Sequence, residues 1–253
     1  MKRVFFVIFA LVSVSATAQI FVSADTEAQP LTNARATAIV QSNPKTERLT
    51  PFTKVVVDGS VNITFRQVDN IDEMKIVYDT KGNTISRFRA GVDKNGVLQI
   101  VERTETKTVN IATEVTVCYT ALDNISIAHA TALFENTIES RLLDLSVTGG
   151  ANVTIDINTL DALVTCSGKS QLTIGGTSKY FKLTASSAKI EGFELKTTAA
   201  DIDASHESEV NLSVAERLEA VTSTEAKLFY KGRPLILRNK NSLFGGAILS
   251  VEE

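Results

Sequence analysis

The feature that most constrains this chain is a repeat of about nineteen residues that runs from Ile125 to Leu228. Each copy has two apolar anchors eight positions apart, and successive first anchors are spaced 20, 19, 19, 19 and 18 residues apart. The anchor pairs are Ile125/Leu133, Leu145/Val153, Val164/Leu172, Leu183/Ile190 (one residue shorter), Ile202/Val210 and Ala220/Leu228. Around each second anchor, small, polar and apolar residues alternate as in a strand with one buried face. Strands at a fixed period predict a solenoid, in which each coil buries its inner face against the next coil.

The residues between the two anchors are expected to form a corner of the coil, with a small buried residue two positions before the second anchor. These small residues are Thr131, Ala151, Ser170, Ala188, Ser208 and Ala226. Gly149-Gly150 and Gly175-Gly176 are predicted to be turn residues at corners, because neither pair precedes the helical pattern that a phosphate-binding loop needs. Cys166 falls in the same inward column as Val147, which predicts a small core residue.

The corner sequences resemble those of a known family. They read His-Ala-Thr-Ala (129–132), Gly-Gly-Ala-Asn (149–152), Ser-Gly-Lys-Ser (167–170), Ser-Ser-Ala-Lys (186–189), His-Glu-Ser-Glu (206–209) and Thr-Glu-Ala-Lys (224–227). With the opening stretch 52–59 and Tyr230-Lys231-Gly232, they resemble an exported bacterial family, the putative auto-transporter adhesin, head GIN domain family. The resemblance covers residues 50–253 and implies a right-handed parallel β-helix and an adhesive role. Corners with His129, His206 or Thr224 depart from the small-residue pattern of that family. An antiparallel β-sandwich is the alternative fold.

The chain is expected to divide into three parts. Residues 1–18 are typical of a cleaved signal peptide, with two early basic residues, an apolar run and a small-residue cleavage site at 16–18. Residues 19–50 are predicted to be a polar, proline-containing lead segment, and residues 51–253 the β-solenoid domain. Within that domain we expect irregular amino-terminal coils at 51–120, regular repeats at 121–230 and terminal capping strands at 231–253.

A signal peptide predicts export to the periplasm or the cell surface. The apolar run of residues 4–14 is shorter than the roughly 20 residues that a membrane-spanning helix needs, which disfavours a membrane anchor. No cysteine precedes Cys118, so a lipid-anchored form is not expected. No stretch after residue 18 is long and apolar enough to span a bilayer.

The part of the domain before the repeats lacks a clean period. Residues 55–65 alternate around Asp58-Gly59, which predicts a local hairpin or, alternatively, the two sides of a first coil. Residues 84–89 are predicted to form one helical turn. The other predicted elements are a strand at 74–78, a tight turn at 93–96, a strand at 115–119 and terminal strands at 235–237 and 247–249.

Charge and cysteine usage exclude some classes of function. The 26 basic and 29 acidic residues give a net charge of −3, which argues against nucleic acid as a partner because phosphate binding needs a clustered basic excess. Cys118 and Cys166 lie 48 residues apart, about two and a half coils, which places them on different faces. A disulfide needs Cα atoms within about 7 Å, so two free thiols are predicted.

No constellation of residues predicts catalysis. His129 and His206 occupy equivalent corners four coils apart, roughly 19 Å at the spacing of stacked strands, which is too far for one metal ion. Acidic residues recur just before the first anchors, and they are Asp123, Asp144, Asp161, Asp201 (with Asp203 directly after the anchor) and Glu219. A solvated outer face is the expected reading of these acids, with calcium binding as an alternative. No catalytic, cofactor-binding or metal-ligating residue and no cofactor is therefore predicted.

The predicted function is that of an exported, non-enzymatic β-solenoid with an adhesive, binding or envelope-structural role. Its partner is unknown from the sequence, with an envelope protein or a surface glycan as the expected kinds. The alternative is a polysaccharide-active, lyase-like enzyme, because some parallel β-helices are polysaccharide lyases; this rests on fold analogy alone.

Overall fold

The structure, a computed structural model, describes residues 42–81, 86–104, 112–240 and 244–251. The predicted signal peptide lies outside these residues, as does the lead segment before residue 42. The described residues form seventeen strands and one short 3-10 helix. The elements are β1 (Lys45–Arg48), β2 (Lys54–Asp58), β3 (Val61–Gln67), η1 (Ile71–Glu73), β4 (Lys75–Asp79), β5 (Ser86–Val92), β6 (Val97–Thr104), β7 (Thr113–Tyr119), β8 (Asn124–Ala128), β9 (Thr131–Phe134), β10 (Ile138–Thr148), β11 (Asn152–Ser167), β12 (Gln171–Ser186), β13 (Lys189–Ser205), β14 (Glu209–Thr222), β15 (Lys227–Lys231), β16 (Ile236–Lys240) and β17 (Ala247–Ser250).

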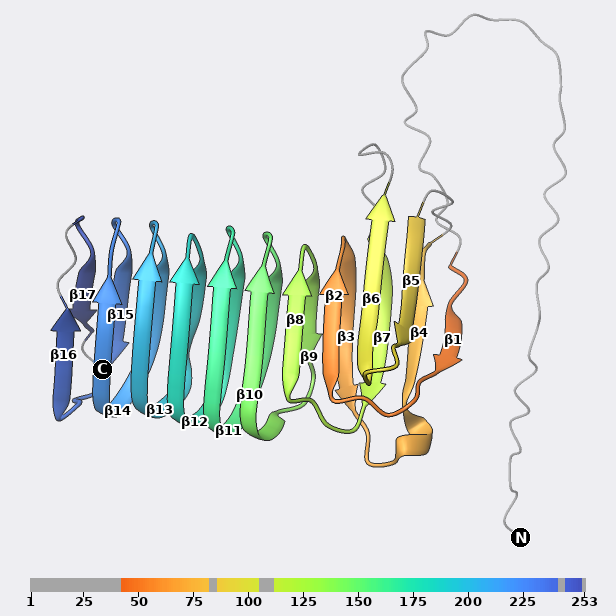
Figure 1. Cartoon of the computed structure of the whole chain (residues 1–253), viewed down its shortest axis with the longest axis horizontal. Helices are drawn as coiled ribbons and strands as arrows, with labels where there is room; N and C mark the ends of the chain where they lie inside the picture. The colour runs from red at the N-terminus through yellow and green to blue at the C-terminus, as the bar shows by residue number, and fades with distance from the viewer. Residues whose placement is uncertain (1–41, 82–85, 105–111, 241–243, 252–253) are drawn as a thin grey trace, which may run out of the picture. The chain divides into compact units, whose positions relative to one another are not determined.

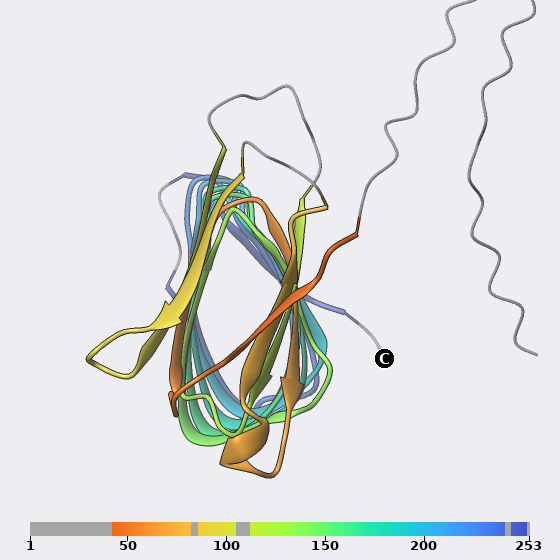
Figure 2. The ribbon, with the colours of Figure 1, turned by 90° about the vertical axis from the view of Figure 1, so that its right-hand side faces the viewer.

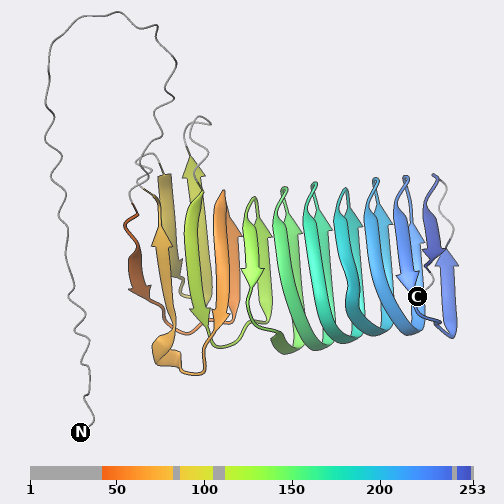
Figure 3. The same cartoon turned by 180° about the vertical axis from the view of Figure 1, so that it is seen from behind.

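The strands stack into a solenoid with two walls (Figure 1). The front wall, nearer the viewer in Figure 1, contains β5, β6, β2, β8, β10, the second halves of β11–β14, and β16, in that order. The back wall, seen in Figure 3, contains β1, β4, β7, β3, β9, the first halves of β11–β14, β15 and β17. The chain rises along the front wall, turns at an upper corner and descends along the back wall while it advances, so the β-helix is right-handed.

The coils stack in the register that the repeat predicts. Asn152 pairs with Gln171 and Leu145 with Val164, so neighbouring coils are offset by 19 residues along the chain. Val153 and Leu172 are direct partners and are almost fully buried, as expected of one interior column. Pairing between successive coils is parallel on both walls, so the parallel β-helix is confirmed and the antiparallel sandwich is wrong.

One anchor was predicted one residue too late. Ala132, not Leu133, pairs with Val153 and is buried, whereas Leu133 points outward with 45% of its surface exposed. The buried small residue at this corner is consequently Ala130 rather than Thr131. The physical reason is the length of the corner, because only one residue there, His129, has a left-handed backbone conformation, with φ of 60°.

The amino-terminal coils are stacked out of sequence order. β2 and β3 pair with β8 and β9 on one side and with β6 and β7 on the other, so they form an interior coil and not the predicted hairpin. The later coil of β6 and β7 lies outside them.

The described part of the predicted helical turn, residues 86–89, is instead in strand β5, which pairs antiparallel with β6. The tight turn at 93–96 is confirmed by the Asp93 carboxylate, which accepts hydrogen bonds from the Asn95 and Val97 N–H groups.

The end of the solenoid near β1 is closed by strands that run against the stack. β4 pairs antiparallel with β7, and β1 pairs antiparallel with β4. Figure 2 shows β1 running obliquely across this end. Met74 and Ile76 are buried beneath it and continue the hydrophobic core that fills the space between the walls.

The repeat predicts that one coil can be removed without disturbing the others. Deletion of residues 145–163 joins Asp144 to Val164, and these residues occupy the places of Asp144 and Leu145 in the intact coil. We expect this variant to remain folded, at the cost of one coil's stacking energy, since solenoid stability is roughly a sum of nearest-neighbour terms. Deletion of residues 145–154 brings the wrong side of the coil to the junction. Circular dichroism and cooperative melting should show a folded protein only for the nineteen-residue deletion; equal damage would contradict the coil register.

In the part of the core that the structure describes, one buried side-chain polar atom has no hydrogen-bond partner. The Tyr119 side chain is buried beside the Phe65 ring, and its hydroxyl has no hydrogen-bond partner among the described residues. Burial raises the pKa of this phenol to about 12. A buried polar group without a partner costs about 1–3 kcal/mol, so this hydroxyl opposes folding.

Replacement of Tyr119 by Phe is therefore expected to raise the free energy of unfolding by about 1 kcal/mol, measured by denaturant titration. Tyr78→Phe is the matched control, because the Tyr78 hydroxyl donates to the Glu47 carboxylate at 2.9 Å. That control should lower stability by about 0.5 kcal/mol. A loss of stability in both variants would mean that the Tyr119 hydroxyl has a favourable partner in solution.

Candidate binding surface

The outward side chains of the front wall form columns that run along the solenoid. One column contains, in successive coils, Asp144, Leu163, Lys182, Asp201 and Glu219. The predicted acidic residues do lie on this outer wall, but a leucine and a lysine separate Asp144 from Asp201. Only Asp201 and Glu219 lie on consecutive coils of this column, so the acids do not form a continuous row.

Several of these acids have partners within the wall. The Asn124 amide donates to the Asp144 carboxylate at 3.1 Å, and the Glu219 carboxylate accepts a hydrogen bond from the Arg238 guanidinium at 3.2 Å. Asp161 and Asp203 lie in the flanking columns, and Asp123 precedes β8. Within the described part of the chain, no three His, Cys, Asp or Glu side chains are placed to share a metal ion.

The front wall has an unexpected apolar hollow. Leu142, Leu163 and Tyr180 point outward from three neighbouring coils with 59%, 39% and 43% of their surface exposed. They line a depression of about 260 Å³. We call this depression the front hollow. Its rim carries both charge signs, from Asp161, Lys182, Asp201 and Arg217.

The charged rim of the front hollow is largely unpaired. Asp161, Lys182 and Asp201 make no ion pair or side-chain hydrogen bond with any residue that the structure describes, whereas Arg217 lies 3.8 Å from the Glu219 carboxylate. The Lys179 ammonium lies 5.3 Å from the centroid of the Tyr180 ring, a cation–π contact that orients the ring. The hollow therefore combines an apolar floor with charged groups that remain available to a ligand.

The front hollow was not predicted from the sequence, although a periodic signal was present. In three successive coils the residue three positions before the first anchor points outward, and these residues are Leu142, Asp161 and Tyr180. Two large apolar residues at an outward position of a solenoid are unusual. Leu163 was noted only as an interruption of the acidic column, and it completes the apolar surface.

The upper corners form a second ordered surface. Four corners are tight turns with two consecutive left-handed residues, and these pairs are Gly149-Gly150, Gly168-Lys169, His206-Glu207 and Thr224-Glu225. The Ala226 N–H, for example, donates to the Ser223 carbonyl oxygen at 3.1 Å across such a turn. Two left-handed residues with this closure correspond to a type I′ turn. The corner between the anchors Leu183 and Ile190 is one residue shorter, and Ser187 alone is left-handed there. A polar depression of about 350 Å³ lies between this corner and the two neighbouring corners.

Both histidines lie at upper corners, and the structure gives them separate partners. His129 Nδ1 lies 2.9 Å from the Asp58 carboxylate in the neighbouring coil. His206 Nδ1 lies 3.0 Å from Ser205 Oγ and 3.3 Å from Ser186 Oγ. Each histidine thus ties its corner to adjacent residues.

The two glycine pairs differ in role. Gly149 and Gly150 occupy a corner as predicted, both with positive φ. Gly175 and Gly176 instead lie within β12, next to a shift in its register with β13, so they are strand residues and not the predicted turn residues. A Cβ on Gly176, whose φ is 95°, would collide with the Ile157 backbone, and this close approach requires glycine at the bulge.

Neither cysteine is a candidate nucleophile. Cys118 and Cys166 are both free, as predicted, and both are buried. Cys166 pairs with Val147 in the inward column, and burial raises the pKa of its thiol to about 12. A thiol with so high a pKa carries almost no thiolate at neutral pH, so it is unreactive.

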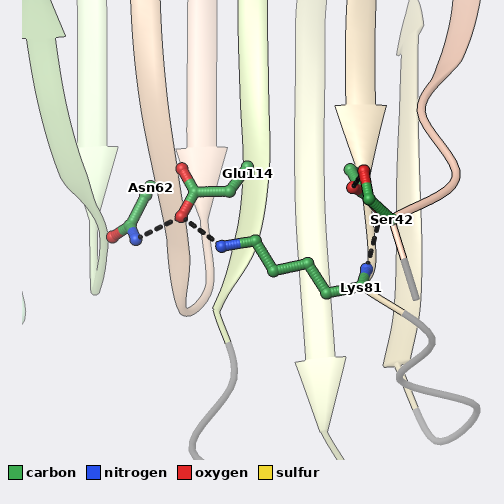
Figure 4. A network of polar contacts seen from close by, with 5 residues as sticks. Ser42, Asn62, Lys81 and Glu114 are labelled. Atoms are coloured by element: carbon green, nitrogen blue, oxygen red, sulfur yellow. Dashed lines mark hydrogen bonds and ion pairs between the residues drawn. The ribbon is translucent and has the colours of Figure 1, made fainter. Parts of the chain in front are cut away.

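A polar cluster on the back wall also has a structural role (Figure 4). The Glu114 carboxylate accepts hydrogen bonds from Lys81 Nζ at 2.8 Å and Asn62 Nδ2 at 3.1 Å. Burial raises the pKa of Glu114, but these two hydrogen bonds and the lysine charge outweigh it and hold the pKa below its usual value. The Asp79 carboxylate accepts from Ser42 Oγ at 2.7 Å, which lowers the pKa of Asp79. The cluster fastens the start of the described chain to β3, β4 and β7.

The sequence matches the family described as putative auto-transporter adhesin, head GIN domain, over residues 51–234. The chain belongs to this family. No curated protein matches the sequence. In the described residues, no helix is long and apolar enough to cross a membrane.

Solved structures share the fold of this head GIN domain. A putative adhesin from Bacteroides fragilis is 17% identical with a TM-score of 0.74, and the match covers 83% of this chain and 97% of that chain. A putative adhesin from Parabacteroides merdae is 13% identical with a TM-score of 0.64, covering 83% and 96%. A putative lipid binding protein from Parabacteroides distasonis is 16% identical with a TM-score of 0.58, covering 83% and 96%. At these identities the likeness establishes the fold alone.

The corner geometry predicts opposite effects of introducing a glycine at one left-handed corner residue and removing a glycine from another. Thr224 is β-branched and has a φ of 51°, a conformation that costs a residue with a Cβ about 1–2 kcal/mol. Thr224→Gly should therefore raise the free energy of unfolding by about 0.5 kcal/mol, after the larger entropy of glycine in the unfolded chain is subtracted.

Gly150→Ala is the reciprocal control. A Cβ on Gly150 would meet no atom within 4 Å, so this substitution adds backbone strain without a steric clash. Its melting temperature should fall, while that of Thr224→Gly rises. A shift of both variants in the same direction would show that left-handed strain at the corners does not govern stability.

Proposed function

We propose that this head GIN domain is an exported, non-enzymatic binding protein that attaches to a surface glycan of the bacterial envelope through its front wall. The family and its structural neighbours carry the names adhesin or lipid-binding protein, which supports a binding role in general terms. Export follows from the signal-peptide pattern of residues 1–18. The observation that carries the proposal is the front hollow.

At the front hollow, outward apolar side chains of three neighbouring coils gather on one wall. On a solvated strand face, Leu142, Leu163 and Tyr180 gain nothing for folding from their exposed surface. An exposed apolar cluster with a polar rim is typical of a binding site. The walls are flat and the corners are short, so an extended ligand can lie along the wall across several coils.

The chemistry of the front hollow fits a saccharide. The Tyr180 ring offers an apolar face for the C–H groups of a sugar ring and a hydroxyl for hydrogen bonding. The Asp161 and Asp201 carboxylates can accept hydrogen bonds from sugar hydroxyls, and Lys182 can donate to them. Because the rim has both charge signs, a neutral glycan is favoured over a strongly anionic one.

The alternative of a polysaccharide lyase has no support. Such an enzyme needs carboxylates that converge on a cation and a base beside them. In the described front wall, Leu163 and Lys182 separate Asp144 from Asp201, and Asp144 and Glu219 already have partners. Neither the family name nor the neighbours' names describe an enzyme.

A glycan array probed with the full exported protein tests this proposal. We expect selective binding to neutral envelope glycans, and Tyr180→Ser combined with Leu163→Ser should weaken it at least tenfold. Two apolar contacts and one aromatic face are lost, and each contributes about 1 kcal/mol to the free energy of binding, which accounts for that factor. The measurement is the dissociation constant of the selected glycan for each protein.

The matched control is Thr173→Ala combined with Gln171→Ser on the back wall, where both side chains are exposed. This control should bind as the original protein does. Equal weakening by the front-wall and back-wall variants would contradict the proposed site. A different result would overturn the proposal that the ligand is a glycan. If the protein binds no glycan but captures an envelope protein, and the Tyr180 variant abolishes that capture, the hollow is a site for a protein partner.

A further inference from the structure

The two ends of the solenoid are finished differently. At one end, β4 and β5 run antiparallel to their neighbours β7 and β6, and β1 crosses the opening. At the other end, the last coil consists of β16 and β17, which continue the parallel stack. Among the described strands, β16 pairs only with β14 and β17 only with β15, so each leaves one edge of backbone groups without a strand partner.

The hydrophobic core is uncovered at this second end. Leu237 pairs with Leu218, which is fully buried, yet 48% of the Leu237 surface is exposed. Leu235 next to it is 90% exposed. Of the large apolar residues that are exposed in the described chain, those in this coil are Leu235, Ile236, Leu237, Phe244 and Leu249. An open edge beside uncovered apolar side chains is a surface that solenoid proteins ordinarily cap.

A second copy of the same chain can satisfy both open edges with one symmetry operation. A two-fold axis that runs from the front wall to the back wall, perpendicular to the solenoid axis, reverses strand direction and keeps front on front. It therefore sets β16 antiparallel to β16 of the second copy and β17 antiparallel to its β17 at the same time. Both ladders are then continued across the junction, and the uncovered core residues of the two copies face one another.

Contact between opposite ends is less favourable. At the end near β1, β4 runs antiparallel to the stack and β1 crosses the opening. A head-to-tail contact would therefore set the uncovered core of one copy against the covered end of the next, so the apolar residues of the last coil would not meet an equivalent surface.

We propose that two copies of this domain join tail to tail through β16 and β17, forming a two-fold symmetric rod with a continuous core. The junction buries Leu235 and Leu237 and pairs the free edges of both walls. The interaction is independent of the proposed glycan site, because the apolar residues Leu142, Leu163 and Tyr180 lie on β10, β11 and β12, and β13 and β14 separate them from β16.

The oligomeric state of the full exported protein tests the proposal. Sedimentation equilibrium should give a dimer, and small-angle scattering should give a rod about twice as long as one solenoid. Leu237→Glu should shift the protein to the monomer. Leu235→Glu provides a second variant, because a side chain that is 90% exposed in one copy can be changed without loss of the monomer fold.

Leu133→Glu is the matched control, since Leu133 is as exposed as Leu237 but lies on the back wall away from the end. It should remain dimeric, and all three variants should keep the circular dichroism of the original protein. Four results would each overturn the proposal. These are a monomer at every concentration, open-ended oligomers that grow with concentration, a compact side-by-side dimer, and a dimer that survives both end substitutions.

Discussion

Every feature of this molecule depends on the parallel pairing of each coil with the next. Because each strand pairs with the strand 19 residues ahead, the number of residues in each coil is fixed. A slip of one residue would turn the buried side chains outward. The left-handed corner residues serve this constraint by reversing the chain within two residues. The cost is backbone strain at Lys169, His206, Glu207, Thr224 and Glu225, which the hydrogen bonds along the corners offset.

The regular coils were predictable because their information is local and repeated. The spacing of Val153 and Leu172 in the sequence predicts that they pair, and the alternation around them shows which face is buried. Prediction was wrong where the period gave no guidance. Leu133 was predicted to point inward because the two anchors of its coil were assumed to lie eight positions apart. Only the backbone geometry shows that this corner is one residue shorter. The order of β2 and β6 along the wall follows from contacts between distant segments, which no local pattern records.

The candidate site was less predictable than the fold, for a physical reason. A solenoid repeats its inward residues because they must pack, whereas each outward residue is free to differ from coil to coil. The acidic residues attracted attention because carboxylates suggest chemistry, yet the structure separates Asp144 from Asp201 and gives Asp144 a neutral partner. Leu142 and Tyr180 looked like ordinary apolar residues of strands. Only their placement on the outer face makes them significant.

The symmetry of the tail-to-tail rod bears on how a flat binding wall can hold a glycan. A two-fold axis that runs from front to back leaves both front walls on the same side, so two front hollows face one surface. Each hollow offers only about 260 Å³ and few apolar groups, which suits weak binding of a short stretch of sugar. If the proposed function holds, two such sites on one rigid rod would bind a repetitive polymer with an effective concentration set by their fixed separation, and the combined affinity could exceed that of either site by about 10²–10⁴. A rotation about the solenoid axis would instead point the hollows apart. The open last coil and the front hollow are thus connected by geometry, because the same edges that join two copies also align their binding walls.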